Sequence, residues 1–193
     1  MTQIYLIRHA QSSPSSDMPH NEWPLTSLGR TQAAALAPFL QARGVSALFS
    51  SPYVRAVDTI LPFSEASGLD LLRDPDLQER RHSPEMLADL EGTIRRCFDD
   101  PDWSVGGGET NRAVRFRMRR GILEAARQHP SGTIAMASHG QAIAILLTLL
   151  RPEFGHAGWV SMRTPDIFRL EAVGSKIQWD GRTLRDEIEL PEG

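Results

Sequence analysis

The sequence predicts an α/β fold: a three-layer α/β/α sandwich whose sheet is mixed but mainly parallel, with helices on both faces. Four short apolar runs alternate with longer segments of helical period, which is the order of a parallel sheet covered by helices. Two strand-like runs, 167–173 and 176–179, are joined by a Gly-Ser pair and indicate an antiparallel hairpin. The chain has 193 residues, 40% of them hydrophobic, which suits a single domain over 1–193.

The four strands of the parallel part are rich in β-branched, aromatic and leucine residues, as buried strands are. They are expected at 3–7, 45–49, 69–72 and 133–137. The helix after the first strand is capped by Thr26 or Ser27 and ends at Gly44, and Pro38 within it predicts a kink. Two further helices follow the second and fourth strands, and they are expected at 53–66 and 142–150.

The segment between the third and fourth strands contains two more predicted helices. Ser83 and Pro84 begin the first, because a hydroxyl can cap a helix and proline suits its first position, and Asp99 ends it. Three glycines at 106–108 predict a loop, and the next helix starts at Thr110. Arginines crowd this second helix, and we expect all of them on its solvent-exposed face. They are Arg112, Arg115, Arg117, Arg119 and Arg120.

Composition and charge exclude several functional classes. A net charge of −3 and a pI near 6.1 give no overall field that would recruit nucleic acid or an anionic membrane. No apolar run reaches the roughly 18 residues of a membrane span, and the first apolar stretch ends at Arg8, too early for a signal peptide; we therefore expect a cytoplasmic protein. The single cysteine, Cys97, is expected in the core and excludes an internal disulfide. Four histidines lack metal-ligand spacing, so we expect no metal site: His20, His82, His129 and His156.

Residues with chemical potential follow the ends of the predicted strands. His9 follows the first strand, Arg55 the second and His139 the fourth, and Glu79 lies seven residues beyond the third. Ligands of open α/β sheets bind outside the carboxyl ends of the strands. We therefore expect these side chains to converge on one crevice.

The chemistry that such a group supports is phosphoryl transfer. A neutral imidazole is a competent nucleophile toward phosphorus, and the adjacent cation of Arg8 lowers the pKa of His9 and so keeps its ring neutral. Arg8 and Arg55 can hold the transferring group as bidentate ligands. His139 precedes a helix whose free N–H groups favour a bound phosphate. Glu79 is the best-placed general acid for the leaving oxygen.

Six sequence blocks resemble the signature motifs of the histidine phosphatase (phosphoglycerate mutase-like) superfamily. In family order they are LIRHAQS at 6–12, LTSLGRTQA at 25–33, SSPYVRAVDT at 50–59, LQER at 77–80, GGET at 107–110 and SHGQ at 138–141. Ala10 and Gln11 stand where the family usually has Gly and Glu. Neither position carries the phosphoryl chemistry, so the pocket is expected to survive these changes.

The resemblance implies a phosphohistidine intermediate on His9, with Glu79 as general acid and base and with no metal or other cofactor. Arg8, Arg55 and His139 would complete the phosphate pocket. Further phosphate-binding or substrate-binding residues are expected at Gly140, Gln141, Ser15 and Arg80. Arg80, Arg81 and residues 85–109 would form a substrate-facing cap, an insertion at about 80–110.

Departures from the family pattern favour its phosphatase branch over its mutase branch. The mutases follow the acid glutamate with a tyrosine-glycine pair and a lysine-bearing segment, where this chain has RRHSP at 80–84. Their tryptophan-asparagine pair after the first motif is replaced by Pro14-Ser15. We predict a phosphomonoester hydrolase of the histidine acid phosphatase type that acts on a small molecule.

Two alternatives stay open at this point. One is phosphoglycerate mutase-type phosphoryl transfer, and the other is a non-catalytic module that binds phosphate or phosphopeptides on the same fold. The sequence does not identify the physiological substrate, including whether it is a phosphoprotein, and it leaves monomer and homodimer equally open.

Overall fold

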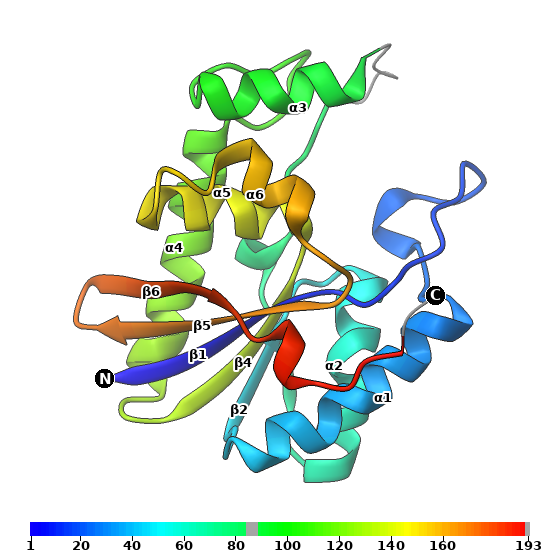
Figure 1. Ribbon diagram of the computed structural model, residues 1–193, viewed down its shortest axis with the longest axis vertical. Helices are drawn as coiled ribbons and strands as arrows, with labels where there is room; N and C mark the ends of the chain where they lie inside the picture. The colour runs from blue at the N-terminus through cyan, green and yellow to red at the C-terminus, as the bar shows by residue number, and fades with distance from the viewer. Residues whose placement is uncertain (84–88, 192–193) are drawn as a thin grey trace.

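A six-stranded mixed sheet forms the centre of the computed structural model, which describes residues 1–83 and 89–191 (Figure 1). The strand order is β3-β2-β4-β1-β5-β6. The strands are β1 (Thr2–Arg8), β2 (Ala47–Ser50), β3 (Leu71–Arg73), β4 (Thr133–Ser138), β5 (Asp166–Val173) and β6 (Lys176–Thr183). The first four pair in parallel, whereas β5 runs antiparallel to β1 and β6 antiparallel to β5. The predicted mainly parallel sheet with a closing hairpin is therefore confirmed.

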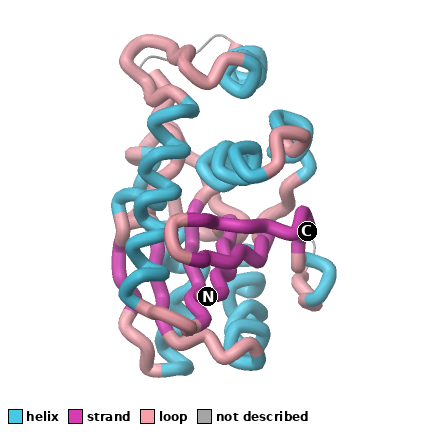
Figure 2. Tube along the Cα trace, turned by 90° about the vertical axis from the view of Figure 1, so that its left-hand side faces the viewer, coloured by secondary structure: helices cyan, strands magenta, loops and turns pink. Residues whose placement is uncertain are grey.

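Helices cover both faces of this sheet (Figures 1 and 2). On one face lie α1 (Ser27–Ala42) and α2 (Val54–Ser67), and on the other α4 (Asn111–Gln128), α5 (Gly140–Leu150) and α6 (Gly155–Ser161). A further helix, α3 (Leu90–Asp99), lies beyond α5 and α6, away from the sheet (Figure 1). Three short 3₁₀ helices complete the described elements: η1 (His20–Glu22), η2 (Pro75–Leu77) and η3 (Arg185–Glu187).

The alternation of side chains along β1 builds two hydrophobic cores. Ile4 and Leu6 belong to the core beneath α4 and α5, and Tyr5 and Ile7 belong to the core beneath α1 and α2. Successive side chains of a strand point to opposite faces, so a strand covered on both sides must be apolar at every position. This is why the run at 4–7 has no charged residue and its one polar group is the Tyr5 hydroxyl, which donates to Gln3. The two-sided burial confirms the three-layer fold class.

Several element boundaries differ from the sequence prediction. The helix expected from Ser83 falls partly outside the described residues, and the described helix α3 begins at Leu90 after Asp89, whose carboxylate accepts a hydrogen bond from Gly92 N. Helix α5 begins two residues earlier than expected, and α6 was not predicted. Helix α1 continues through Pro38 to its end. Within the described residues, no helix is long and apolar enough to span a bilayer.

The carboxyl ends of β1, β2 and β4 meet at one edge of the sheet, as their parallel register requires. The chain leaving β1 is held there by α1, where a Cβ on Gly29 would lie only 2.0 Å from the carbonyl oxygen of Gln11. Glycine is required for this close approach. The residues that follow β1 are thereby fixed in front of the sheet edge.

Candidate active site

His9 directly follows β1 and is nearly buried, with 8% of its surface exposed. Its Nδ1 lies 2.8 Å from the carbonyl oxygen of Ala10, and its Nε2 lies 3.2 Å from Nε of Arg55. A carbonyl can only accept and a guanidinium can only donate, so Nδ1 carries the proton and Nε2 the lone pair. Burial, and then the charges of Arg55 and Arg8, lower the pKa of His9 to about 3. The ring is therefore a neutral nucleophile near pH 7.

Arg55 lies in the first turn of α2 and is 2% exposed. Besides its contact with His9, it donates from NH1 to the carbonyl oxygen of His20 (2.6 Å), and its NH2 lies 3.1 Å from Nε2 of His20. The guanidinium is thus held against the His9 ring by the loop that follows β1. This orientation is what a rigid clamp on a phosphoryl group needs.

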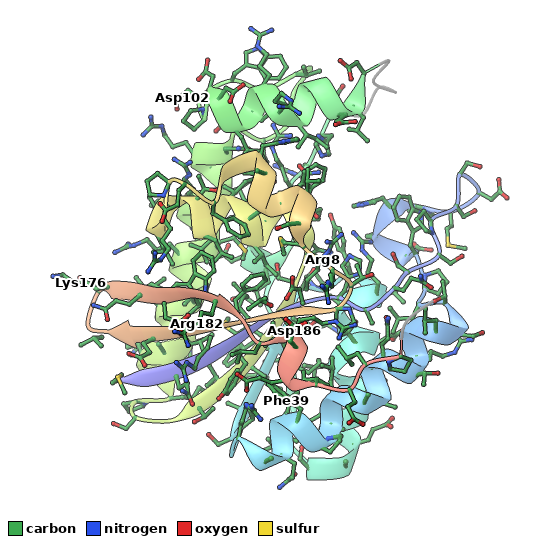
Figure 3. The ribbon with its side chains drawn as sticks, viewed as in Figure 1. Arg8, Phe39, Asp102, Lys176, Arg182 and Asp186 are labelled. Carbon is green, nitrogen blue, oxygen red and sulfur yellow. The ribbon has the colours of Figure 1, made fainter. Side chains whose placement is uncertain are left out.

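Arg8, labelled in Figure 3, lies at the end of β1 beside the first turn of α5. Its NH1 donates to the carbonyl oxygen of Met162 (2.8 Å), while its buried Nε has no hydrogen-bond partner among the described residues. A Cβ on Gly140 would lie 3.1 Å from this Nε, so Gly140 leaves the room that the guanidinium occupies. Arg8 therefore offers an unused N–H donor at the site.

His139 precedes α5 and is completely buried. Its Nε2 lies 2.8 Å from Oγ of Ser51, and its ring centre lies 5.2 Å from that of His9. Its Nδ1 has no hydrogen-bond partner in the part of the chain that the structure describes. Burial, and then the neighbouring His9 and Arg55, hold the pKa of His139 well below its ordinary range. When the Ser51 hydroxyl donates to Nε2, Nδ1 carries the proton and becomes a second unused donor.

Glu79 reaches the same site from the loop after β3, but its partners differ from the sequence expectation. Its Oε1 accepts from the N–H groups of Ala142 (2.9 Å) and Arg80 (2.8 Å), and its Oε2 accepts from Gln141 N at 3.2 Å. Two of the helix N–H groups that we expected to bind phosphate therefore bind the Glu79 carboxylate. The dipole of α5 stabilises a negative charge at its N-terminus, whether that charge belongs to a phosphate or to the Glu79 carboxylate.

The side chains of two expected binding residues have partners outside this group. Ser15 has its hydrogen bonds within its own loop, with Asp17 N and the Trp23 indole. Arg80 is 3% exposed and directs its guanidinium to Cys97 Sγ, the Glu109 carbonyl oxygen and His82 Nδ1. In the described structure neither residue is hydrogen-bonded to His9, Arg55 or His139, so their predicted roles in binding stay predictions. Gly140 lies beside Arg8, as shown above, and Gln141 contributes its N–H to Glu79.

The sequence reasoning missed three residues of the site. Ser51 and Tyr53 lie in the block at 50–59, and that block was the available signal for them. His20 carried no such signal, because it lies in a loop without periodicity. Its ring centre lies 4.5 Å from Trp23 and 5.5 Å from Tyr53. Beside these rings is a pocket of about 480 Å³, lined by His20, Tyr53, Arg80, Arg81, His82, Ser83 and Gly107.

The expectation that all five arginines of α4 face solvent is wrong for Arg117, and Arg115 is half-buried as well. The side chains of Arg112 and Arg120 are 71% and 60% exposed, whereas that of Arg117 is only 12% exposed. The helical period placed Arg117 on the polar side, but a buried carboxylate and three carbonyl groups receive it there. Among the described residues, no group of three or more His, Cys, Asp or Glu side chains is arranged to hold a metal ion.

The grouping of two arginines, two histidines and a glutamate at the carboxyl ends of the parallel strands agrees with a family comparison. The model of the histidine phosphatase superfamily (branch 1) matches residues 4–181. The chain belongs to this superfamily. The resemblance inferred from the six sequence blocks is thereby confirmed.

Individual relatives fall on both sides of the phosphatase–mutase division. A protein of Cronobacter sakazakii named "Probable phosphoglycerate mutase GpmB" is 29% identical over 162 residues, covering 78% of this chain and 75% of that protein. "Bifunctional protein Rv2228c" of Mycobacterium tuberculosis is 31% identical over 159 residues, covering 77% of this chain and 44% of that protein. The solved structure of mycobacterial glucosyl-3-phosphoglycerate phosphatase Rv2419c is 27% identical, with a TM-score of 0.74, and covers 94% of this chain and 96% of that one. These relatives support a phosphatase or mutase type of enzyme.

Proposed function

We propose that the protein is a phosphomonoester hydrolase that acts through a phosphohistidine intermediate on His9. The observation that carries this proposal is the geometry of the imidazole. Nδ1–H is fixed on the Ala10 carbonyl, and the Nε2 lone pair faces Nε of Arg55, with the ring of His139 centred 5.2 Å from that of His9. A nucleophile held in one tautomer beside anion-binding groups is what attack on phosphorus requires.

In the first step Nε2 attacks phosphorus, and the bond from phosphorus to the leaving oxygen breaks. Arg8, Arg55 and His139 stabilise the charge on the equatorial oxygens. The N–H groups at Arg8 Nε and His139 Nδ1 are suited to this, because within residues 1–83 and 89–191 they have no hydrogen-bond partner. Glu79, in its acid form, gives its proton to the leaving oxygen. Oε2 is the oxygen better suited to carry that proton, because it accepts one N–H whereas Oε1 accepts two.

In the second step water attacks the phosphorus of phospho-His9. The Glu79 carboxylate takes a proton from the water, the phosphorus–nitrogen bond breaks, and phosphate leaves. Glu79 is then back in its acid form and His9 is again neutral. The enzyme is regenerated without a cofactor.

Hydrolysis rather than transfer to a second hydroxyl is supported by the residues around the site. RRHSP at 80–84 replaces the mutase segment after the acid, and Pro14-Ser15 replaces the mutase tryptophan-asparagine pair. We propose that Arg81 and the described part of 85–109 form a cap over the leaving group; residues 85–88 lie outside the described structure. The substrate is a small phosphomonoester of unspecified leaving group.

The intermediate is tested by rapid quench with a ³²P-labelled phosphomonoester. Acid-labile, base-stable label is expected on the wild type and on His129→Gln, a histidine outside the site, and is expected to be lost in His9→Ala. Label that persists undiminished in His9→Ala, or that resides on serine, would refute the mechanism. Isomer formation from a phosphoglycerate in the presence of a bisphosphate primer would favour the mutase alternative.

The acid is tested by the leaving group. General acid catalysis contributes about 10²–10⁴-fold, so on an alkyl phosphate Glu79→Gln is expected to lose that much in the rate of His9 phosphorylation, measured by rapid quench. This rate is used because kcat also contains the hydrolysis of phospho-His9, for which Glu79 is the base. The loss should be small on p-nitrophenyl phosphate, whose leaving group needs little protonation. Equal losses on both substrates would remove Glu79 from the acid role while leaving the proposal for His9 intact.

A further inference from the structure

Arg117 of α4 makes five hydrogen bonds beneath the loop that carries Glu79. Its Nε and NH2 donate to the two carboxylate oxygens of Glu109 at 2.9 and 3.0 Å. NH1 donates to the carbonyl oxygens of Asp76 (2.8 Å) and Gln78 (2.7 Å), and NH2 also donates to that of Glu79 (3.2 Å). A guanidinium has five N–H groups, so the contacts account for its full donor capacity.

Glu109 extends this clamp to the other side of Glu79. Its carboxylate accepts from Arg81 N (2.9 Å), and its own N–H donates to the Arg81 carbonyl oxygen (2.8 Å). Burial raises the pKa of Glu109, but hydrogen bonds from Arg117 and Arg81 N outweigh it, so the pKa lies below its ordinary value. Glu109 is therefore ionised, and its charge balances that of Arg117. The pair fixes the position of the loop without adding net charge to it.

Gly121 allows the loop that contains Asp74 and Asp76 to lie directly on α4. A Cβ on Gly121, one helical turn after Arg117, would lie 2.8 Å from Oδ2 of Asp74 and 2.9 Å from Cβ of Asp76. Real Cβ atoms do not approach other atoms so closely, so any larger residue would push the loop away. The hydroxyl of Ser138 also donates to the carbonyl oxygen of Leu77 (2.7 Å). The main chain before Glu79 is thus held from both α4 and β4.

We propose that Arg117 is a positioning residue that sets the main chain on both sides of Glu79 and so places its carboxyl group for proton transfer. This inference rests on the proposed acid role of Glu79. Proton transfer requires hydrogen-bond reach of the leaving oxygen, and a misplacement of about 1 Å can cost on the order of 10²-fold in rate. The nucleophile is not held by this clamp, because His9 and Arg55 have their own partners.

The test separates positioning of the acid from general support of the fold. We expect Arg117→Met to lose roughly 10- to 100-fold in the rate of His9 phosphorylation by an alkyl phosphate, measured by rapid quench, with little change in that rate for p-nitrophenyl phosphate and little change in KM. Arg117→Lys should rescue little, since an ammonium cannot make the bidentate contact with Glu109. The double variant Glu79→Gln/Arg117→Met should be no slower on the alkyl phosphate than Glu79→Gln alone.

Arg120→Met is the matched control. Arg120 lies on the same helix and pairs with the carboxylate of Asp76 in the same loop, but its side chain is 60% exposed and touches none of the three carbonyl groups. We expect its removal to change both substrates equally and slightly. Where Arg117→Met does not fold, Gly121→Ala displaces the loop without removing a charge, and it should show the same dependence on the leaving group.

Equal losses on the two substrates, or additive losses in the double variant, would overturn the positioning role. If the proposed function itself is wrong, the His9 and Glu79 variants give different results from those expected above. Label retained in His9→Ala, or Glu79→Gln without leaving-group dependence, would refute the mechanism regardless of how the Arg117 variants behave.

Discussion

Acid conditions should destabilise the folded protein through His9. The folded state holds the pKa of His9 at about 3, chiefly by burial, whereas an unfolded chain has a histidine pKa of about 6.5. Between these values the unfolded chain binds a proton that the folded protein does not. Stability from this group is therefore fully present above about pH 6.5 and falls as the pH drops toward about 3.

The size of the effect follows from the two pKa values. A pH of about 4.5 lies about two units below the pKa of the histidine in the unfolded chain. At ~1.36 kcal/mol per unit, the free energy of unfolding falls by about 3 kcal/mol. A domain has about 5–15 kcal/mol of stability in total, so this loss is a substantial share. His139, whose pKa is lowered in the same direction, adds to the effect.

Urea denaturation at about pH 7 and about pH 4.5 measures this loss. His9→Gln removes the titrating ring, so its loss of unfolding free energy between the two pH values should be smaller than that of the wild type by about 3 kcal/mol. His129→Gln controls for the removal of a histidine outside the site. A loss in His9→Gln equal to the wild-type loss would show that burial of His9 does not disfavour its charged form.

Three further predictions concern the phosphate pocket. Turnover should survive exhaustive treatment with EDTA and should be inhibited by vanadate, because arginines already supply the positive field that metal ions provide elsewhere; activity abolished by EDTA and restored by a divalent ion would contradict this. His20→Ala should lower kcat/KM by roughly ten-fold and weaken inhibition by inorganic phosphate, because Arg55 NH2 loses its partner at 3.1 Å. An unchanged inhibition constant for phosphate would contradict a role of His20 in orienting Arg55. Gly140→Ala should raise KM several-fold, because the added Cβ would lie 3.1 Å from Nε of Arg8; a KM equal to that of the wild type would show that the guanidinium has room to move.

The placement of His9, Arg55 and His139 close together could be predicted from the sequence. His9, Arg55 and His139 each follow a predicted strand, and parallel strands bring their carboxyl ends to one edge whatever the details of packing. The role of the α5 N-terminus was less predictable. The sequence indicated an anion there, but a phosphate and the Glu79 carboxylate satisfy the same N–H groups, and local sequence does not distinguish them.

The sequence by itself determined the order of the strands, the two-sided burial of β1 and the placement of His9, Arg55 and His139 after strand ends. These features follow from periodicity and from parallel connectivity, which are properties of short segments. Only the tertiary structure decided the partners of His20 and Arg117. Arg117 lies 41 residues from Asp76 and 38 from Glu79, and helical period assigned it to the solvent-exposed face. A guanidinium at such a position is buried only when another segment offers enough acceptors, and which segment does so depends on packing across the whole fold.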